Sequence, residues 1–199
     1  MIESCLLALE KLEIIMARAF EFFGSRVGKV SEKQVQRFIL KEFDREGLVL
    51  DRDEPIVAVN ESASHPHYFP GRKSKKICRE DLVLIDIWAR LKKGGSVYAD
   101  ITWMGLVGNK IEGKRMTAFK DVLRARDLGI KFIRKELREG RIPTGYSVDK
   151  VVRNYFKKKD LDKFFIHSTG HSIGSKNCHG DSFNLSKKCK KKIKIGIPF

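Results

Sequence analysis

Two aspartates, Asp86 and Asp100, lie in apolar segments where an ionised carboxylate is out of place. The segments, residues 82–88 and 97–107, are both rich in Val, Ile, Leu and aromatic residues. The polar stretch between them contains two adjacent glycines, and this pattern is typical of a β-hairpin. The sequence therefore predicts one aspartate on each strand of a single hairpin.

The register of the predicted hairpin decides how close the two carboxylates come. If the turn centres near Lys93, Asp86 lies directly opposite Asp100. Like charges that face each other across a strand pair repel, and burial raises the cost. Three solutions are open: the pair shares a proton, it holds a cation, or one aspartate points outward into water.

Histidines gather at two places in the chain and could complete a site with the aspartates. His65 and His67 lie just before the hairpin, His167 and His171 follow a later apolar segment, and His179 comes eight residues after His171. Carboxylate and imidazole ligands together suit Mn, Fe, Co or Zn. The HSTGH segment lacks the glutamate of the helical HExxH motif and contains a glycine. Its histidines are therefore expected to project from a strand or a turn.

The composition predicts a folded and strongly basic protein. The chain has 199 residues, 42% of them hydrophobic, and a formal net charge of +16. A basic surface attracts nucleic acid. However, the sequence has no zinc finger, RNP motif or helix-turn-helix spacing. The basic composition is therefore explained more simply as a general property of the proteins of the host organism.

The cysteines and the N-terminal segment bear on the cellular compartment. Cys5, Cys78, Cys178 and Cys189 are widely scattered and form no CxxC motif, which suits free thiols in a reducing cytosol. The apolar N-terminal segment is interrupted by charges, so it does not resemble a signal peptide, and no apolar run approaches the length of a membrane span. The sequence predicts a soluble, cytoplasmic protein without a membrane partner.

The predicted elements place these residues in an α+β domain. A helix is expected over residues 4–23, a second begins at the capping box of Ser31 and Gln34, and Gly47 ends it. Further expectations are strands at 56–59 and 164–166, a polar loop at 60–76, a helix at 112–138 with Met116, Phe119, Leu123 and Ile133 in the core, and a helix marked by Val148, Val151, Val152 and Tyr155. Without βαβ alternation, an antiparallel sheet with helices on one face is favoured.

Four motifs in order resemble the pita-bread metallopeptidases. They are PHYFP, DLVLIDIW, YADITW and FIHSTGHSIG, and the resemblance extends from about residue 4 to residue 185. Within this superfamily of methionine aminopeptidases, prolidases and creatinases, the chain is most similar to the Xaa-Pro aminopeptidase and prolidase branch. A methionine aminopeptidase is disfavoured because PHYFP replaces an HGIP-type motif. The resemblance implies a curved antiparallel sheet with helices on its outer face.

The resemblance also implies a metal site. Asp86 matches the first metal-binding aspartate, Asp100 the aspartate that bridges two ions, and His171 the metal-binding histidine. In the complete family site, two divalent ions (Mn, Co, Zn or Fe) lower the pKa of a water molecule and so supply a hydroxide. This chain is expected to hold one ion or none.

Three further histidines match positions around the substrate in the family. His67 matches the loop histidine near the substrate, and His167 matches the pocket histidine on the proline side. His179 matches the histidine that stabilises the tetrahedral intermediate or moves protons, although it lies one residue further from His171 than the family pattern has it.

The C-terminal part departs from the family pattern. The family completes its site with two glutamates, the first in a motif like FTIEPG, whereas here the only acid after Asp162 is Asp181 and the chain ends in IGIPF. We therefore expect an incomplete catalytic domain at residues 1–185, without its C-terminal strands, and a solvated Lys-rich tail at 186–199. A fragment, a truncated or frame-shifted gene, and a short protein without catalysis are all consistent with this pattern.

Two functions follow as expectations. The first is a metal-dependent aminopeptidase or dipeptidase that cleaves peptides with proline at the second position, weakly or not at all as this 199-residue chain. The alternative is a non-catalytic protein of the same fold whose basic surface binds nucleic acid or acidic partners. The resemblance also allows a homodimer. A chain that does not fold stably alone is the third option.

Overall fold

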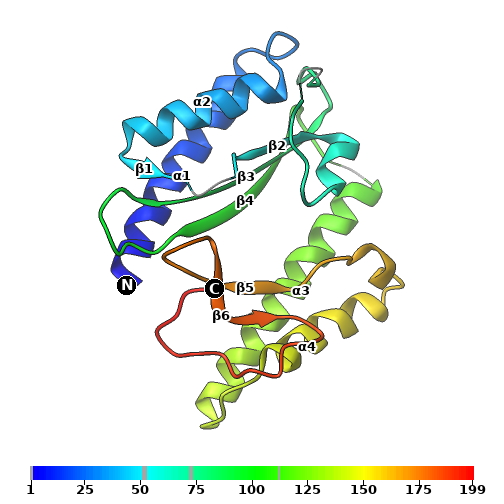
Figure 1. The fold of residues 1–199 in the computed structure, drawn as a ribbon. Helices are drawn as coiled ribbons and strands as arrows, with labels where there is room; N and C mark the ends of the chain where they lie inside the picture. Colours follow the sequence, from blue (N-terminus) through cyan, green and yellow to red (C-terminus); the bar gives the residue numbers. More distant parts are fainter. Residues whose placement is uncertain (1, 51–52, 72–73, 112) are drawn as a thin grey trace. The chain divides into compact units, whose positions relative to one another are not determined.

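A computed structural model describes all residues except 1, 51–52, 72–73 and 112 (Figure 1). The chain divides into two compact units. Unit 1 comprises Met1–Lys110 and Ser175–Cys178, and unit 2 comprises Ile111–Gly174 and His179–Phe199. No helix in the described ranges is long and apolar enough to cross a membrane.

Unit 1 is an antiparallel sheet covered by two helices. Its elements are α1 (Ile2–Gly24), α2 (Glu32–Arg45), β1 (Leu48–Val49), β2 (Ile56–Val59), the 3-10 helix η1 (Asn60–Ser64), β3 (Leu82–Leu91) and β4 (Ala99–Leu106). Strand β3 is central: β4 pairs along one edge, and β1 and β2 pair with successive stretches of the other. The predicted helices, the strand at 56–59 and the hairpin are confirmed.

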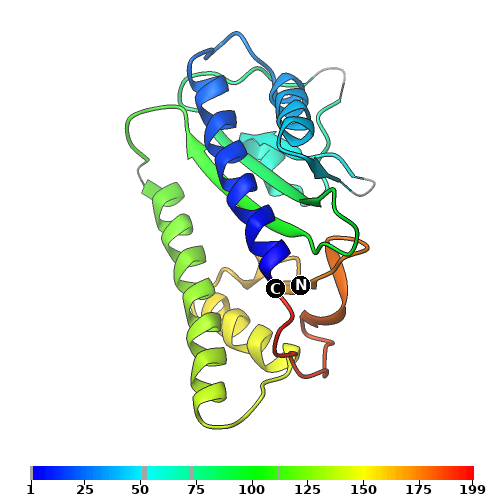
Figure 2. The same ribbon diagram turned by 90° about the vertical axis from the view of Figure 1, so that its left-hand side faces the viewer.

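Alternation along β3 separates a core face from a more open face. Val83, Ile85, Ile87 and Ala89 are buried, whereas the residues between them are half-buried. Helix α1 packs against β3 and β4, and it lies across these strands in Figure 2. The approach is close at Gly105, where an added Cβ would lie 2.3 Å from the Phe20 ring. The even-numbered residues of β3 and β4 therefore occupy the sheet face away from α1.

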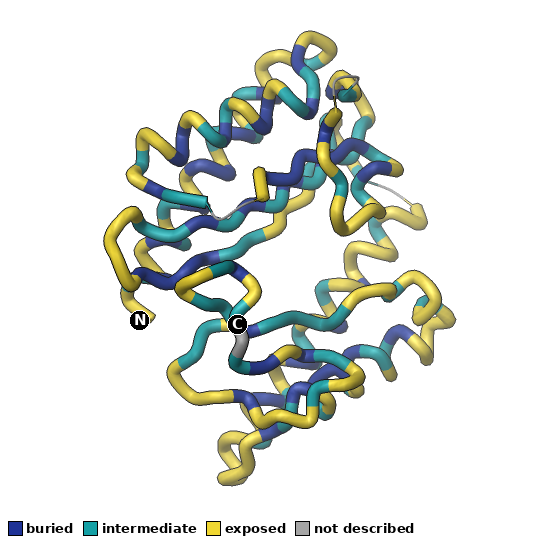
Figure 3. Tube along the Cα trace, in the orientation of Figure 1, coloured by how far each residue is buried: buried dark blue, intermediate teal, exposed yellow. Residues whose placement is uncertain are grey.

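Unit 2 combines two helices with a two-stranded sheet. Its elements are α3 (Gly113–Arg138), α4 (Gly145–Lys157), the 3-10 helix η2 (Asp162–Phe164), β5 (Gly170–Ile173) and β6 (His179–Leu185). Its core contains Ile133 of α3, Val148 of α4, Phe183 and Leu185 of β6, and Ile193. Figure 3 shows buried positions along the inner sides of both helices and along β6.

Two expectations about the strands and the core in the second half of the chain are wrong. The strand predicted at 164–166 does not form: Phe164 and Ile166 are 69% exposed, and the strand begins at Gly170 instead. Phe119 of α3 is exposed, because the α3 face that meets α4 is built from small residues, including Ala125 and Gly129. An added Cβ at Gly129 would lie 3.1 Å from Val152 of α4, so larger side chains do not fit there.

The Lys-rich segment 186–199 is packed within unit 2 and is not a solvated tail. Ile193 is buried in the core, and its backbone N–H donates to the carbonyl of Pro143 at 3.0 Å. The N–H of Gly145, at the start of α4, donates to the carbonyl of Lys191 at 2.9 Å. The N–H of Ile173 in β5 donates to the carbonyl of Pro198 at 2.8 Å. The apolar residues and backbone groups of this segment hold it, while its lysines stay exposed.

Candidate active site

Asp86 and Asp100 lie on the same face of the hairpin, but not directly opposite each other. Asp86 pairs with Thr102, and Asp100 pairs with Trp88. The expected pairing was wrong because the turn centres on Gly94 rather than Lys93, which offsets the aspartates by two residues. An offset of two preserves the face, so both carboxylates occupy the side of the sheet away from α1. Both aspartates are half-buried on this face, which contradicts the solution in which one of them points outward into water.

The environment of Asp86 disfavours its ionised form. Burial, followed by the nearby charge of Asp100, raises the pKa of Asp86 to about 6. The Thr102 hydroxyl donates to Asp86 Oδ1 at 2.7 Å and partly offsets the rise in pKa. A cation beside the two carboxylates would remove both the repulsion and the desolvation cost.

Cys178 joins the carboxylates in unit 1. Its buried thiol donates to Asp100 Oδ2 across 3.1 Å. Burial raises the pKa of the Cys178 thiol, and the charge of Asp100 raises it further. No role for this cysteine follows from its spacing or chemistry alone, although the long spacing between His171 and His179 puts Cys178 where the family pattern has a histidine. All four cysteines are free thiols.

His67 lies in the loop that follows η1, and it is exposed, as is His65. The neighbouring Tyr68 fixes this loop by donating its hydroxyl to Glu32 Oε2 at 2.8 Å. Glu32 is fully buried and also accepts the backbone N–H groups of Val59 and Lys75, each at 2.9 Å. One buried carboxylate thus ties α2 and β2 to the loop that carries His67.

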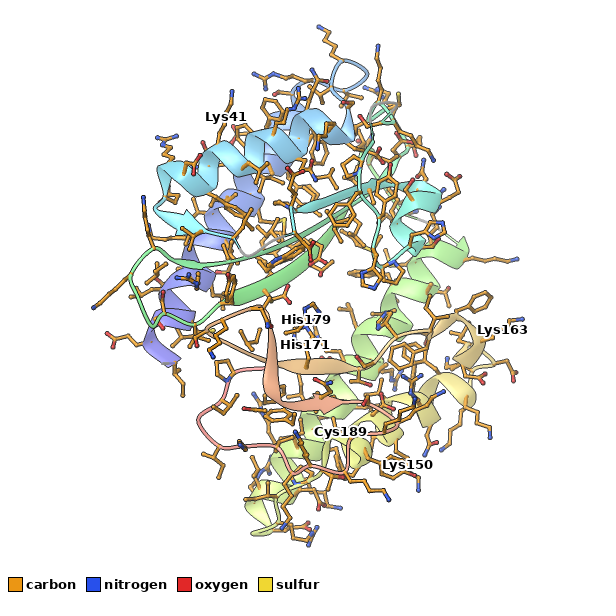
Figure 4. All side chains as sticks on the ribbon, in the orientation of Figure 1. Lys41, Lys150, Lys163, His171, His179 and Cys189 are labelled. Atoms are coloured by element: carbon orange, nitrogen blue, oxygen red, sulfur yellow. The ribbon has the colours of Figure 1, made fainter. Side chains whose placement is uncertain are left out.

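In unit 2, the fold brings His171 and His179 together. They lie on β5 and β6, with ring centroids 4.3 Å apart, and Figure 4 shows the two rings side by side. The strand pairing shifts register between His171 and Ile173. Ser172 bridges the irregularity, because its hydroxyl donates to the Gly180 carbonyl at 3.0 Å and accepts the Phe183 N–H at 3.2 Å. This irregularity accommodates the extra residue between the histidines.

A buried ion pair on α4 fixes the segment that carries His167. Asp149 is 1% exposed and accepts Arg153 Nε at 2.6 Å. Arg153 also donates to the carbonyls of Phe165 and His167, while Asp149 accepts both the N–H and the hydroxyl of Thr169. The bond from Arg153 takes the Phe165 carbonyl, which a strand at 164–166 would have used. The imidazole of His167 is exposed, and its Nδ1 lies 2.7 Å from the carbonyl oxygen of Ser168.

The predicted site residues therefore fall into separate groups. Asp86 and Asp100 lie together in unit 1, and His171 and His179 lie together in unit 2. His67 and His167 occupy separate loops. Within the described ranges, no cluster of three or more His, Cys, Asp or Glu side chains has the geometry to hold a metal ion. The donor types still fit Mn, Co, Zn or Fe, because paired carboxylates and imidazoles are ligands for these ions.

Comparison with known proteins assigns this arrangement to a known group. The model of metallopeptidase family M24 matches residues 7–198. A Mycoplasma genitalium protein that carries the name Xaa-Pro aminopeptidase is 32% identical over 152 residues, which cover 73% of this chain and 38% of that protein. The chain thus spans less than half the length of this curated relative.

Two solved structures show the same fold. A prolidase from Thermococcus sibiricus aligns with a TM-score of 0.82 and 26% identity over 98% of this chain and 49% of its own. An X-Pro aminopeptidase from Thermotoga maritima aligns with a TM-score of 0.77 and 25% identity over 96% of this chain and 50% of its own. The pita-bread fold and the similarity to the Xaa-Pro aminopeptidase and prolidase branch, both predicted from sequence motifs, are confirmed.

Proposed function

Because the chain belongs to metallopeptidase family M24, we propose that it carries the catalytic machinery of a metal-dependent peptidase that cleaves Xaa-Pro bonds. The observation that carries the proposal is the placement of Asp86 and Asp100 on one sheet face, with the pKa of Asp86 raised to about 6. A cation between the two half-buried carboxylates would neutralise them and offset the cost of their burial. The names of similar proteins suggest the substrate: a peptide with proline at its second position.

We assign Asp86, Asp100 and His171 as metal ligands. Divalent ions held there would supply a hydroxide by lowering the pKa of a water molecule, and would polarise the scissile carbonyl. Asp86 and Asp100 contribute the negative charge that attracts the ions. Thr102 fixes the orientation of the Asp86 carboxylate through its hydrogen bond. His171 contributes a neutral imidazole nitrogen.

The remaining histidines are assigned to the substrate. His179 stabilises the developing oxyanion and moves a proton toward the departing proline nitrogen. His167 contacts the proline side, and His67 contacts the substrate from its loop. After His171 the sequence has one acidic side chain, Asp181, where the family pattern has two glutamates. We therefore propose weak turnover by these 199 residues.

Metal titration of the purified chain tests the assignment. Isothermal titration with Mn²⁺ and Co²⁺ should show binding that Asp86→Asn and Asp100→Asn each weaken by about tenfold or more, since each variant removes a charged ligand. The matched control is Asp127→Asn, which changes an exposed carboxylate paired with Arg126. Equal metal binding by all three variants and the parent would overturn the assignment. Hydrolysis of alanyl-proline by the metal-loaded parent, measured beside the same variants, tests the peptidase activity itself.

A further inference from the structure

The positive charge of the chain is concentrated in unit 2. Unit 2 has 22 Lys and Arg residues against nine Asp and Glu residues, an excess of 13. Unit 1 has 19 against 16, an excess of three, and the two excesses make up the net charge of +16. A general property of the proteins of the host organism would raise the charge of both units alike. The segregation therefore points to a property of unit 2 itself.

One face of α4 carries part of this charge in a row. Tyr146, Lys150, Asn154 and Lys157 are exposed and are spaced by four, four and three residues, so they lie on the same side of the helix (Lys150 is labelled in Figure 4). The row is about 17 Å long at the rise of an α-helix. The one acidic residue of α4, Asp149, is buried in an ion pair and does not offset the charge of this face.

Three further lysines lie beside the first turn of α4. The backbone N–H of Tyr146 donates to the carbonyl of Cys189 at 2.6 Å, which holds the following residues next to the helix. These residues are Lys190, Lys191 and Lys192, and all three are exposed. We call these three lysines and the exposed face of α4 the basic strip.

Tyr146 adds an aromatic ring to the basic strip. The residue is 43% exposed, and the ammonium nitrogen of Lys150 lies 5.9 Å from the ring centroid. Proteins bind single-stranded nucleic acid with this combination, because lysines contact the phosphates and an exposed ring stacks on an unpaired base. A membrane-bound helix would instead expose an apolar face, whereas α4 buries its apolar residues Val148, Val152 and Phe156.

We propose that the basic strip binds single-stranded nucleic acid, RNA or DNA. Lys150, Lys157 and the three lysines at 190–192 contact the phosphates, and Tyr146 stacks on a base. The strip is long enough for about four or five nucleotides, which is at the lower end of the range of single-stranded sites. This binding is a further activity of the chain and does not rest on the proposed peptidase function.

Fluorescence anisotropy with labelled RNA and DNA single strands of about 12 nucleotides tests the proposal. The 199-residue chain is used with a chelator present, so neither metal nor turnover contributes. We expect both strands to bind, and the tighter of the two identifies the source of the ligand. A plot of log association constant against log salt concentration should have a slope of about −3.5, because five lysines displace counterions from a single strand.

A charge-matched pair of triple variants locates the site. Replacement of Lys190, Lys191 and Lys192 by Gln should weaken binding about tenfold or more at low salt and make the slope less steep by about 2. The control removes the same charge from exposed positions of unit 1 and should change affinity by less than about twofold; it replaces Lys29, Lys41 and Lys93 by Gln. Thermal melts establish that both variants are folded.

Variants of Tyr146 separate stacking from charge. Tyr146→Ala should weaken binding of the single strands about tenfold and leave the salt slope unchanged, since no cation is lost. Tyr146→Phe keeps the ring and should bind like the parent. A duplex of the same sequence should bind more weakly than either strand, because its bases are already paired and stacked.

Four outcomes would overturn the proposal. They are binding that salt does not weaken, an equal loss in both triple variants, parental affinity in Tyr146→Ala, and a duplex that binds as tightly as the single strands. Vesicles that contain an anionic phospholipid are the remaining probe. Binding of the chain to these vesicles without a response to either single strand would assign the basic strip to a membrane surface instead.

Discussion

Asp86 is the residue whose ionised form the fold disfavours most clearly. It is half-buried, it shares a sheet face with Asp100, and it accepts a hydrogen bond from the Thr102 hydroxyl. Its raised pKa means that the folded chain binds this proton more tightly than the unfolded chain does. Folding stability without metal must therefore depend on pH.

We expect the contribution of Asp86 to the stability of the metal-free chain to fall as the pH rises from about 4 to about 6. Below the unfolded pKa, Asp86 is neutral in both states and costs nothing. Above about 6 it is charged in both, and the folded state bears the full penalty of about 1–3 kcal/mol. Urea unfolding at a series of pH values, with a chelator present, measures this loss.

Asp86→Asn is the matching variant for this pH dependence. It should be more stable than the parent at pH 7 by the same amount and equal to it at pH 4. Added Mn²⁺ should stabilise the parent but not the variant. The same pH dependence in parent and variant would contradict the assignment of the effect to Asp86.

At this scale, residue types and spacing predicted much of the candidate site. Because side chains alternate along a strand, an error of two residues in the register leaves both aspartates on the same face. The shared face of Asp86 and Asp100 could therefore be predicted although the register was not. The register itself depended on how the loop at Gly94-Gly95 closes, and adjacent glycines allow several closures. Cys178 could not be found from chemistry, because a single cysteine is usually a buried apolar residue.

Among the elements, the β5–β6 hairpin depends on Gly180. A Cβ at this position would lie 2.8 Å from the Ile173 carbonyl carbon and 2.9 Å from both the Gly174 nitrogen and the Ser172 oxygen. All three are backbone atoms, so they cannot move aside as a flexible side chain would. The close contact falls within the irregular pairing that brings His171 and His179 together.

We expect Gly180→Ala to destabilise the chain by about 1–3 kcal/mol and to separate the two histidine rings. NMR ring signals of His171 and His179 measure the local effect, and urea unfolding measures the global one. Gly94→Ala is the control, because a Cβ there meets no atom within 4 Å. Unchanged histidine signals in the Gly180 variant would contradict this role.

The Asp149–Arg153 ion pair of α4 holds the segment at residues 165–169 in place. Asp149→Asn should cost about 3 kcal/mol, because it leaves the guanidinium of Arg153, whose side chain is only 17% exposed, without its counter-charge. Arg153→Lys keeps the charge but loses the planar fork that reaches the Phe165 and His167 carbonyls. Amide hydrogen exchange should accelerate at residues 165–169 in both variants.

Arg126→Lys is the matched control for the Arg153 variant. Arg126 forms an exposed ion pair with Asp127, and exposed pairs contribute little to stability. It should change neither stability nor exchange at residues 165–169. Equal amide hydrogen exchange at residues 165–169 in the parent and in Arg153→Lys would show that this segment keeps its conformation without the guanidinium of Arg153.

The elements predicted best were those with strong local signals. The amphipathic pattern of α2 and its start at Ser31 were visible in sequence, and the backbone N–H of Ser31 indeed donates to Gln34 Oε1. The strand expected at 164–166 does not form, because the Phe165 carbonyl bonds to Arg153, a tertiary contact that the local sequence pattern does not show. The predicted core face of α3 was wrong for a related reason. Helix α4 packs so closely against α3 that the contact requires Gly129 and excludes larger side chains.

At the scale of the whole molecule, the excess of basic residues is the dominant property. The net charge of +16 disfavours compact states through self-repulsion, and salt screens this repulsion. We expect the melting temperature to rise by about 2–4 °C from low to moderate NaCl, equivalent to about 1 kcal/mol. Thermal unfolding in NaCl at fixed pH measures it. A melting temperature that falls with salt would show instead that attractive ion pairs dominate.

The fold was predicted from motifs, whereas the division into two units was not. Segment Ser175–Cys178 belongs to unit 1, although the residues on both sides of it belong to unit 2. Such a crossing arises from contacts distant in sequence, above all that of Cys178 with Asp100. The Lys-rich composition of 186–199 likewise concealed the few apolar residues, chiefly Ile193, that anchor it.

The hydrogen bond from Cys178 to Asp100 gives the carboxylate pair a spectroscopic reporter. The S–H stretching vibration absorbs in an infrared window free of amide bands, and its frequency falls as its hydrogen bond strengthens. A difference spectrum between the parent and Cys178→Ser isolates this one oscillator from the other three thiols. Its position would shift when a cation binds beside Asp100, without a label and without turnover.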